Sequence, residues 1–182
     1  AVTNVSPASI TNGVTPIASS GNDADSVRAD VQALFAAYIA ANMTPANGVW
    51  IMSATTALAL SMLTNPLGQP EFPGVTMNGG TFWGMPVIVS EYTPAGFVIL
   101  ANASDIYLAD DGQVVIDASR EASLQMDDAP TNASNPATAT TTVSMFQTNS
   151  VAIRAERWIN WQKRRAQAVQ VLSGVAWGQP TP

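Results

Sequence analysis

The chain has 182 residues and a formal net charge of −6, and it contains neither cysteine nor histidine. A chain of this length forms one domain, or one domain and a smaller piece, and can bury a hydrophobic core. Without cysteine, disulfides and thiolate metal sites are excluded, and without histidine a Ser-His-Asp triad within the chain is excluded. The acidic balance argues against general binding to phosphate backbones.

The low charge density is the second compositional signal. Charged residues make up 11% of the chain, less than half of the roughly 25% that is usual in soluble domains. Interface cores are depleted in charged residues, so this composition favours a subunit surrounded by neighbours, with a low-charge or secreted monomer as the alternative. No apolar run reaches the ~18 residues that a membrane-spanning helix requires.

The first third of the chain predicts an extended segment followed by helix, strand and helix. Residues 1–22 show no sustained period and are expected to be an extended lead-in segment. Apolar residues then recur at helical spacing, which predicts a helix over 24–41. A short apolar strand is expected at 49–52, and Ser53 is placed to cap a second helix that runs to Leu63.

The middle of the chain predicts β-structure. Residues 67–79 are rich in proline and glycine and are expected to form a loop, and 81–92 is expected to be one long strand. Strands at 98–100 and 106–108 follow. Asp111-Gly112 then precedes a further apolar run, which predicts a hairpin and makes a meander the simplest arrangement.

The last third predicts a short strand, a loop and two longer strands. Residues 122–126 are expected to form the short strand, and 128–142, which is rich in Ala, Thr, Asn and Ser, a flexible return loop. Alternating side chains predict strands at 150–156 and 168–173. We expect 151–153 to pair outside the sheet that contains Val87, Ile99 and Val114.

Positive charge is concentrated near the C-terminus, interleaved with tryptophans. This arrangement could stack on single-stranded nucleic acid, but the acidic remainder of the chain favours pairing of these residues with carboxylates. We therefore predict that they bond acidic groups of a neighbouring subunit or domain. Five of the seven basic residues form this group: Arg154, Arg157, Lys163, Arg164 and Arg165.

Other clusters of reactive side chains have simpler explanations. Asp105, Asp110, Asp111 and Asp117 could be taken for a calcium site, but their spacing fits no EF-hand loop and turn chemistry explains the central pair. Lys163 is the single lysine, and no serine motif pairs with it as a catalytic dyad. We expect no catalytic residue, no cofactor and no metal.

The end of the chain resembles the C-terminal end of the major capsid proteins of tailed bacteriophages, the family whose fold is named after phage Hong Kong 97. The shared pattern is an aromatic-Gln-x-Asn start, a Val-Ala-Ile-Arg-x-Glu strand, an Asn-Trp-x-x-Arg-Arg turn and an apolar strand closed by glycine, all present at 146–174. Further similarity lies at 80–87 and 117–126. The resemblance covers roughly 20–177.

The resemblance implies an α+β fold in two regions. An axial domain over 23–143 would contain a central mixed sheet flanked by helices, and 144–182 would supply the closing strands of a peripheral domain. The family's N-terminal arm, extended loop and long spine helix would precede residue 1. Without them, we expect the chain alone to remain a monomer or small oligomer.

The function implied by the resemblance is mechanical. It is that of a structural subunit of an icosahedral phage or prophage capsid, which self-assembles around packaged DNA. Its partners would be copies of itself, with scaffold and portal proteins as further candidates. It would neither bind nucleic acid in a sequence-specific way nor bind a membrane. It would reside in the virion, and in the host cytoplasm before assembly. The alternative is an adhesin-like binding module of a phage or bacterial surface, and an enzyme is a distant third.

Overall fold

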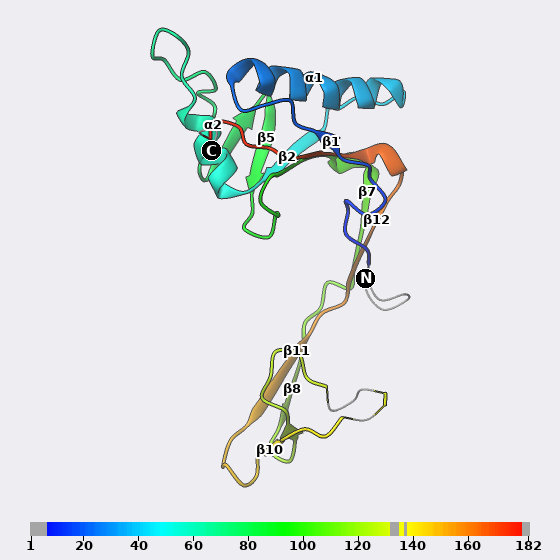
Figure 1. The fold of residues 1–182 in the computed structure, drawn as a ribbon. Coiled ribbons are helices and arrows are strands. Elements are labelled where there is room, and N and C mark those ends of the chain that lie inside the picture. Colours follow the sequence, from blue (N-terminus) through cyan, green and yellow to red (C-terminus); the bar gives the residue numbers. More distant parts are fainter. Residues whose placement is uncertain (1–6, 132–134, 137, 180–182) are drawn as a thin grey trace. The chain divides into compact units, whose positions relative to one another are not determined.

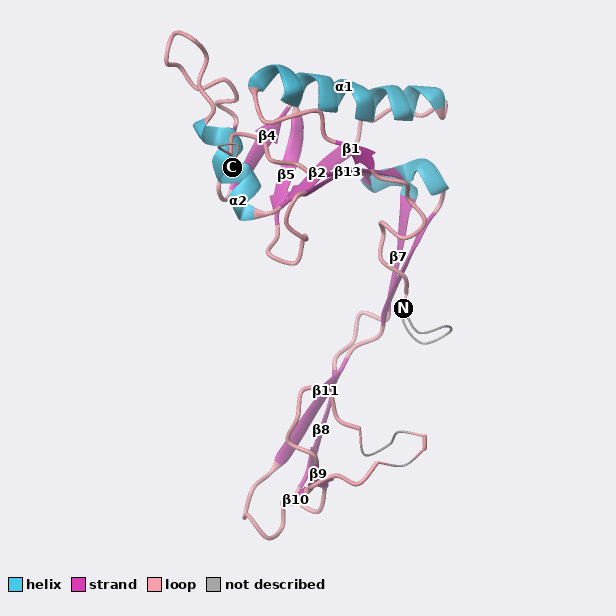
Figure 2. Ribbon diagram, in the orientation of Figure 1, coloured by secondary structure: helices cyan, strands magenta, loops and turns pink. Residues whose placement is uncertain are grey.

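The computed structural model describes residues 7–131, 135–136 and 138–179. The chain divides into two compact units, which we call unit 1 (Ala1–Leu108 with Trp161–Pro182) and unit 2 (Ala109–Asn160). Figure 1 shows the course of the chain, and Figure 2 shows that both α-helices belong to unit 1. The boundary expected between 143 and 144 lies inside unit 2.

The two helices begin where the sequence predicts. Helix α1 (Ala24–Ala40) is capped by Asp23, whose carboxylate accepts a hydrogen bond from the Ser26 amide at 2.9 Å. Hydrogen bonding from Ser26 also lowers the pKa of Asp23. Helix α2 (Ala54–Met62) is capped by Ser53, which confirms the predicted cap. No helix among the described residues is both long and apolar enough to cross a lipid bilayer.

Unit 1 is built on a seven-stranded mixed sheet with the order β1-β13-β6-β2-β5-β4-β3. The β1–β13 and β2–β5 pairs are parallel, and the other pairs are antiparallel. The strands are β1 (Ile17–Ala18), β2 (Gly48–Met52), β3 (Val75–Thr76), β4 (Gly79–Phe82), β5 (Met85–Val89), β6 (Phe97–Asn102) and β13 (Val169–Ser173).

Both faces of this sheet are packed. On one face, Trp50, Leu100 and Leu172 lie in a core with Leu34 and Tyr38 of α1, and all five are fully buried. Because successive side chains of a strand alternate between faces, the intervening residues form a second, smaller core on the opposite face. Its buried members are Ile99, Ala101, Val169 and Val171, and Ile10 and Val14 of the lead-in segment pack against them.

The predicted long strand over 81–92 is wrong, because the chain reverses within it. Trp83 and Gly84 have φ angles of 52° and 77°, the left-handed values that a tight hairpin turn of the primed types requires. Strands β4 and β5 therefore form an antiparallel hairpin, with Phe82 opposite Met85. The short strand β3 lies within the predicted loop over 67–79.

Residues 168–173 lie in unit 1, whereas the resemblance implied closing strands of a peripheral domain over 144–182. The segment is a strand, as predicted, but β13 lies inside the central sheet between β1 and β6. Its fully buried residues Val169 and Leu172 point to the two opposite cores of unit 1. Hydrophobicity on both faces favours an interior position in a sheet.

The remaining strands form two-stranded ribbons. Strand β7 (Ile106–Asp110) pairs with β12 (Ile159–Lys163), β8 (Val115–Ser119) with β11 (Ala152–Glu156), and β9 (Ser123–Leu124) with β10 (Val143–Ser144). The division between the units falls within β7 and β12. Two single turns of 3-10 helix, η1 (Ala103–Asp105) and η2 (Ala166–Ala168), precede β7 and β13.

The predicted hairpin at Asp111-Gly112 and the predicted meander are therefore wrong. Strands β7 and β8 follow each other, yet each pairs with a strand from later in the chain. Next to the β7/β12 pair, the Asp111 amide donates a hydrogen bond to the Trp158 carbonyl at 3.2 Å.

Strand β11 pairs outside the sheet of Val87 and Ile99, as predicted, whereas Val114 does not belong to that sheet. Of the predicted return loop over 128–142, residues 132–134 and 137 lie outside the described residues, as do residues 1–6 of the lead-in segment.

Candidate assembly surface

The β8/β11 ribbon of unit 2 has one apolar and one polar face. The register pairs Ile116 with Ala155 and Ala118 with Ile153. Paired residues of neighbouring strands point to the same face, so these four side chains form one apolar surface. We call it the ribbon face. The other face carries the charged and polar residues, among them the directly paired Asp117 and Arg154, together with Val115 and Ala152.

The ribbon face is open to solvent in the described part of the chain. Ile116 is 69% exposed and Ile153 is 74% exposed. Met145 is the single buried hydrophobic residue among the described residues of unit 2, at 5% exposure. Contiguous exposed apolar surface on a folded unit marks an interaction site. This surface was not predicted, although the alternation at 150–156 already indicated a strand with two different faces.

Arg154 is bonded on the polar face of the same ribbon. Its guanidinium lies 2.8 Å from the Asp117 carboxylate and 3.2 Å from that of Glu156. The hydrogen bond with Asp117 raises the pKa of Arg154. The arginine and the aspartate are more than half exposed, so in the isolated chain this is a surface ion pair. Such pairs contribute little to stability because water screens them.

Arg157 holds the carboxylate of Asp110 with both arms of its fork. Its Nε donates to Asp110 Oδ1 at 3.1 Å, and its Nη2 bonds the second carboxylate oxygen. The hydrogen bond from Arg157 lowers the pKa of Asp110, and the same contact raises the pKa of Arg157. This bidentate geometry fixes the orientation of both side chains. The neighbouring Trp158 is 71% exposed.

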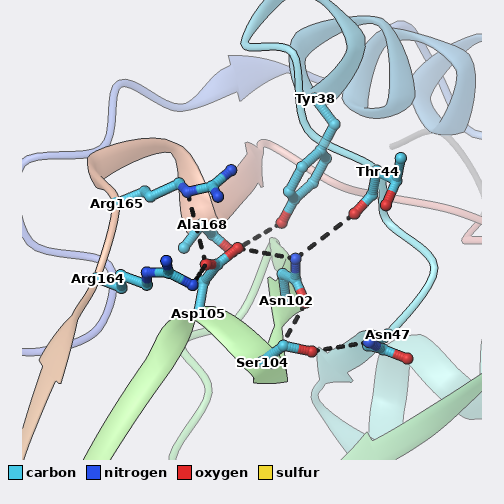
Figure 3. Close-up of polar contacts among 9 residues, drawn as sticks. All are labelled: Tyr38, Thr44, Asn47, Asn102, Ser104, Asp105, Arg164, Arg165 and Ala168. Atoms are coloured by element: carbon cyan, nitrogen blue, oxygen red, sulfur yellow. Dashed lines mark hydrogen bonds and ion pairs between the residues drawn. The ribbon is translucent and has the colours of Figure 1, made fainter.

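The other basic residues of the predicted group lie in unit 1, and two of them, Arg164 and Arg165, surround one buried carboxylate (Figure 3). Arg164 Nη1 and Arg165 Nε lie 3.8 and 3.7 Å from Asp105 Oδ1. The second oxygen of Asp105 accepts a hydrogen bond from Asn102 Nδ2 at 3.0 Å. Lys163 Nζ donates instead to the Asn12 main-chain carbonyl at 2.8 Å.

Tyr38 completes this polar cluster from helix α1. Its hydroxyl lies 2.8 Å from the Leu100 carbonyl oxygen and 2.9 Å from that of Ala168, and Figure 3 shows it reaching toward the start of β13. Burial raises the pKa of Tyr38 above its usual range, so the hydroxyl remains a donor. The cluster joins α1, β6 and the segment before β13, which is a structural role.

The structure thus separates the four arginines of the predicted basic group into two sets. Arg154 and Arg157 bond carboxylates of unit 2, whereas Arg164 and Arg165 bond a carboxylate of unit 1. Of the four aspartates weighed as a calcium site, Asp105, Asp110 and Asp117 bond different arginines. Among the described residues, no group of three or more acidic side chains is arranged to hold a metal ion.

Solved structures define the class of fold. A structure from Mycobacterium phage Adephagia matches with a TM-score of 0.63 and 15% identity, over 93% of this chain and 54% of the other. The capsid of an empty GTA particle matches with a TM-score of 0.55 and 17% identity, over 90% of this chain and 50% of the other. The fold is the α+β Hong Kong 97-like capsid fold.

The sequence places the chain within this class. The model of the "Phage capsid family" matches residues 3–174, and the chain belongs to that family. The "Capsid polyprotein" of Pseudomonas phage PAJU2 is 63% identical over 183 residues, which is 98% of this chain. The chain spans 27% of the length of that relative.

Proposed function

We propose that this chain is a structural subunit, or part of one, of an icosahedral phage capsid that self-assembles around packaged DNA. Its role is mechanical: complementary surfaces repeat by symmetry until the shell closes. Membership of the phage capsid family supports this function. The single structural observation that carries it is the exposed ribbon face, which needs a partner to cover it.

The proposal assigns the two units to the two regions implied by the family resemblance. Unit 1, with its helices and central mixed sheet, corresponds to the axial domain, and unit 2 corresponds to part of the peripheral domain. This assignment shifts the predicted boundaries. Residues 109–143 move to the peripheral part, and the segment that contains β13 moves to the axial part.

We place the ribbon face at the centre of the assembly contact and the arginines around it. Interface cores are apolar and poor in charge, whereas charged residues lie at the rim. Arg154 and Arg157 are already paired with carboxylates on their own unit, which orients their guanidinium groups. The remaining donors of each fork are then available to a neighbouring subunit.

The partners of this subunit are copies of itself, with scaffold and portal proteins as further candidates. Its location is the virion capsid, and the host cytoplasm before assembly. Each proposed contact has a structural role, so the proposal includes no catalytic step.

The first test is electron microscopy of the full-length gene product, in which closed particles are expected. In that product, Ile153→Asp should lower the yield of closed particles, because it places a charge in the apolar contact. Ser119→Asp is the matched control, since Ser119 lies on the opposite face of the same ribbon. Equal yields from the two variants would exclude the ribbon face as the contact.

The arginines are tested separately. Arg154→Ala and Arg157→Ala should leave the full-length subunit soluble and folded while lowering the yield of closed particles. Wild-type yields from both would remove the arginines from the interface but leave the capsid function intact. A nucleic-acid role would instead give normal shells with impaired, salt-sensitive binding of single strands.

The isolated chain provides a further test. We expect these 182 residues to remain a monomer or small oligomer, as measured by light scattering after size exclusion. Shell-sized particles formed by this chain alone would show that its own surfaces are sufficient for closure.

A further inference from the structure

The turn at 9–14 presents an asparagine–glycine pair in an unusual environment. The Asn12 amide donates to the Ser9 carbonyl at 2.9 Å, and the Val14 amide donates to the Thr11 carbonyl at 3.1 Å. Gly13, between them, has a φ of 74°, and a side chain built there would meet no atom within 4 Å. Asn12 and Gly13 are exposed, and the Gly13 amide has no acceptor among the described residues.

A cation is bonded to the peptide group that joins these two residues. Lys163 Nζ donates a hydrogen bond to the main-chain oxygen of Asn12 at 2.8 Å. That oxygen and the Gly13 nitrogen belong to one conjugated amide. An ammonium at the oxygen stabilises the negative charge that develops on this amide when the nitrogen loses its proton. The sequence contains no other lysine.

We propose that Asn12-Gly13 is a self-modification site, at which Asn12 is converted to aspartate or isoaspartate with Lys163 as the activating group. Water or hydroxide removes the Gly13 amide proton, and the nitrogen attacks Asn12 Cγ to form a five-membered imide. The Cγ–Nδ2 bond breaks, and the nitrogen leaves as ammonia after taking up a proton. One water molecule then opens the ring at either carbonyl, without oxidation or reduction.

The chain carries two other asparagine–glycine pairs that serve as internal references. At the first, the Asn47 side chain donates to Ser104 at 2.8 Å, and the Gly48 amide donates to the Pro45 carbonyl at 2.8 Å. The Gly48 nitrogen, which would attack, and the Asn47 side chain, which would be attacked, are therefore both held by hydrogen bonds. The Gly13 amide and the Asn12 side chain have no such partners among the described residues.

The second reference pair is held by the sheet. Asn78 is exposed, but Gly79 is buried in strand β4, opposite Thr76. A Cβ built on Gly79 would lie 2.7 Å from the Val87 carbonyl oxygen, so the backbone there has little room to move. Closure of the imide ring requires the glycine nitrogen to swing toward the asparagine side chain. The structure favours this movement at Gly13 over Gly79.

In the isoaspartate product, the free carboxylate is the former main-chain carbonyl group of Asn12, which Lys163 bonds before the reaction. In the isoaspartate form the main chain gains one methylene unit, which changes the path of the turn at 9–14. This segment also packs Ile10 and Val14 against the second core of unit 1. The modification therefore acts on the contact between the lead-in segment and the central sheet.

The experiment follows the three pairs in the folded 182-residue chain at mildly alkaline pH. Proteolysis and mass spectrometry give the rate of amide-to-acid conversion at Asn12, Asn47 and Asn78. Asn12 should convert fastest in the native protein, and the three rates should converge in concentrated guanidinium. If Asn12 converts no faster than the other two in the folded wild-type chain, the proposal is wrong, and this comparison requires no variant.

Two substitutions test the role of the cation. Lys163→Met should slow conversion at Asn12 by about tenfold. This factor corresponds to the loss of one charge-assisted hydrogen bond in the activated state. Lys163→Arg keeps a cationic donor and should restore most of the rate. The rates at Asn47 and Asn78 should be the same in all three proteins, which controls for altered folding. An unchanged Asn12 rate in folded Lys163→Met would overturn the assignment of Lys163.

Discussion

The two units of this chain differ in how many of their apolar side chains they bury. Unit 1 encloses apolar residues on both faces of its central sheet, and Trp50, Leu100 and Trp177 are fully buried. Unit 2 leaves both isoleucines of its longest ribbon largely exposed. A two-stranded ribbon is marginally stable by itself in water, whereas a packed sheet with helices is stable. The comparison predicts that the stability of the isolated chain comes mainly from unit 1.

The strongest test of this comparison is truncation of one apolar side chain in each unit. Leu100→Ala, in the core of unit 1, should lower the free energy of unfolding by about 2–5 kcal/mol. Ile153→Ala, on the ribbon face, should change it by less than about 0.5 kcal/mol in the isolated chain. Denaturant unfolding followed by circular dichroism measures both. Similar losses from the two variants would mean that unit 2 has a core of its own.

Buried and exposed carboxylates give a second, smaller contrast. Asp30 in unit 1 is 2% exposed and accepts hydrogen bonds from the Ser19 hydroxyl, the Ser20 amide and the Trp177 indole. Asp30→Ala removes the acceptor that these donors share and should cost about 1–3 kcal/mol.

Asp117→Ala is the matched control for Asp30→Ala, because the Asp117 side chain is 56% exposed and its contact with Arg154 is screened by water. We expect no measurable change in the unfolding midpoint of this variant. The contrast fails if both aspartate variants unfold at the wild-type denaturant concentration.

The smallest expected effect is a pH dependence within unit 2. The pKa of Asp110 is lowered, chiefly by hydrogen bonding from Arg157. A lowered folded-state pKa adds stability above the ordinary aspartate pKa of about 3.9, and this stability is lost as the pH falls through the folded value. Arg157→Ala should move the pKa of Asp110 back toward the ordinary range.

Carbon-detected NMR titration of the Asp110 carboxyl group measures this shift. Arg154→Ala is the control, because Arg154 bonds Asp117 and Glu156 instead. An unchanged Asp110 titration in Arg157→Ala would show that the bidentate contact between Arg157 and Asp110 does not persist in solution.

Features that depend on residues close together in the chain could be predicted from the sequence. Ser53 ends a short strand and accepts the Thr56 amide, so both the cap and the start of α2 were predictable. The alternation over 150–156 was sufficient to predict β11, because successive side chains of a strand face opposite sides. The motifs at 146–174 also indicated the family, which the family match confirms.

Strand pairing, by contrast, depends on long-range packing in the folded chain. Asp111-Gly112 is a typical hairpin sequence, yet β8 pairs with β11, so that Asp117 lies opposite Arg154, far along the chain. Likewise, β13 was predicted as a strand but not as an inner strand of the central sheet. Local residue preferences define a strand or helix. The partner of a strand depends instead on which apolar faces, far apart in the sequence, are buried together, and a single sequence does not show which faces meet.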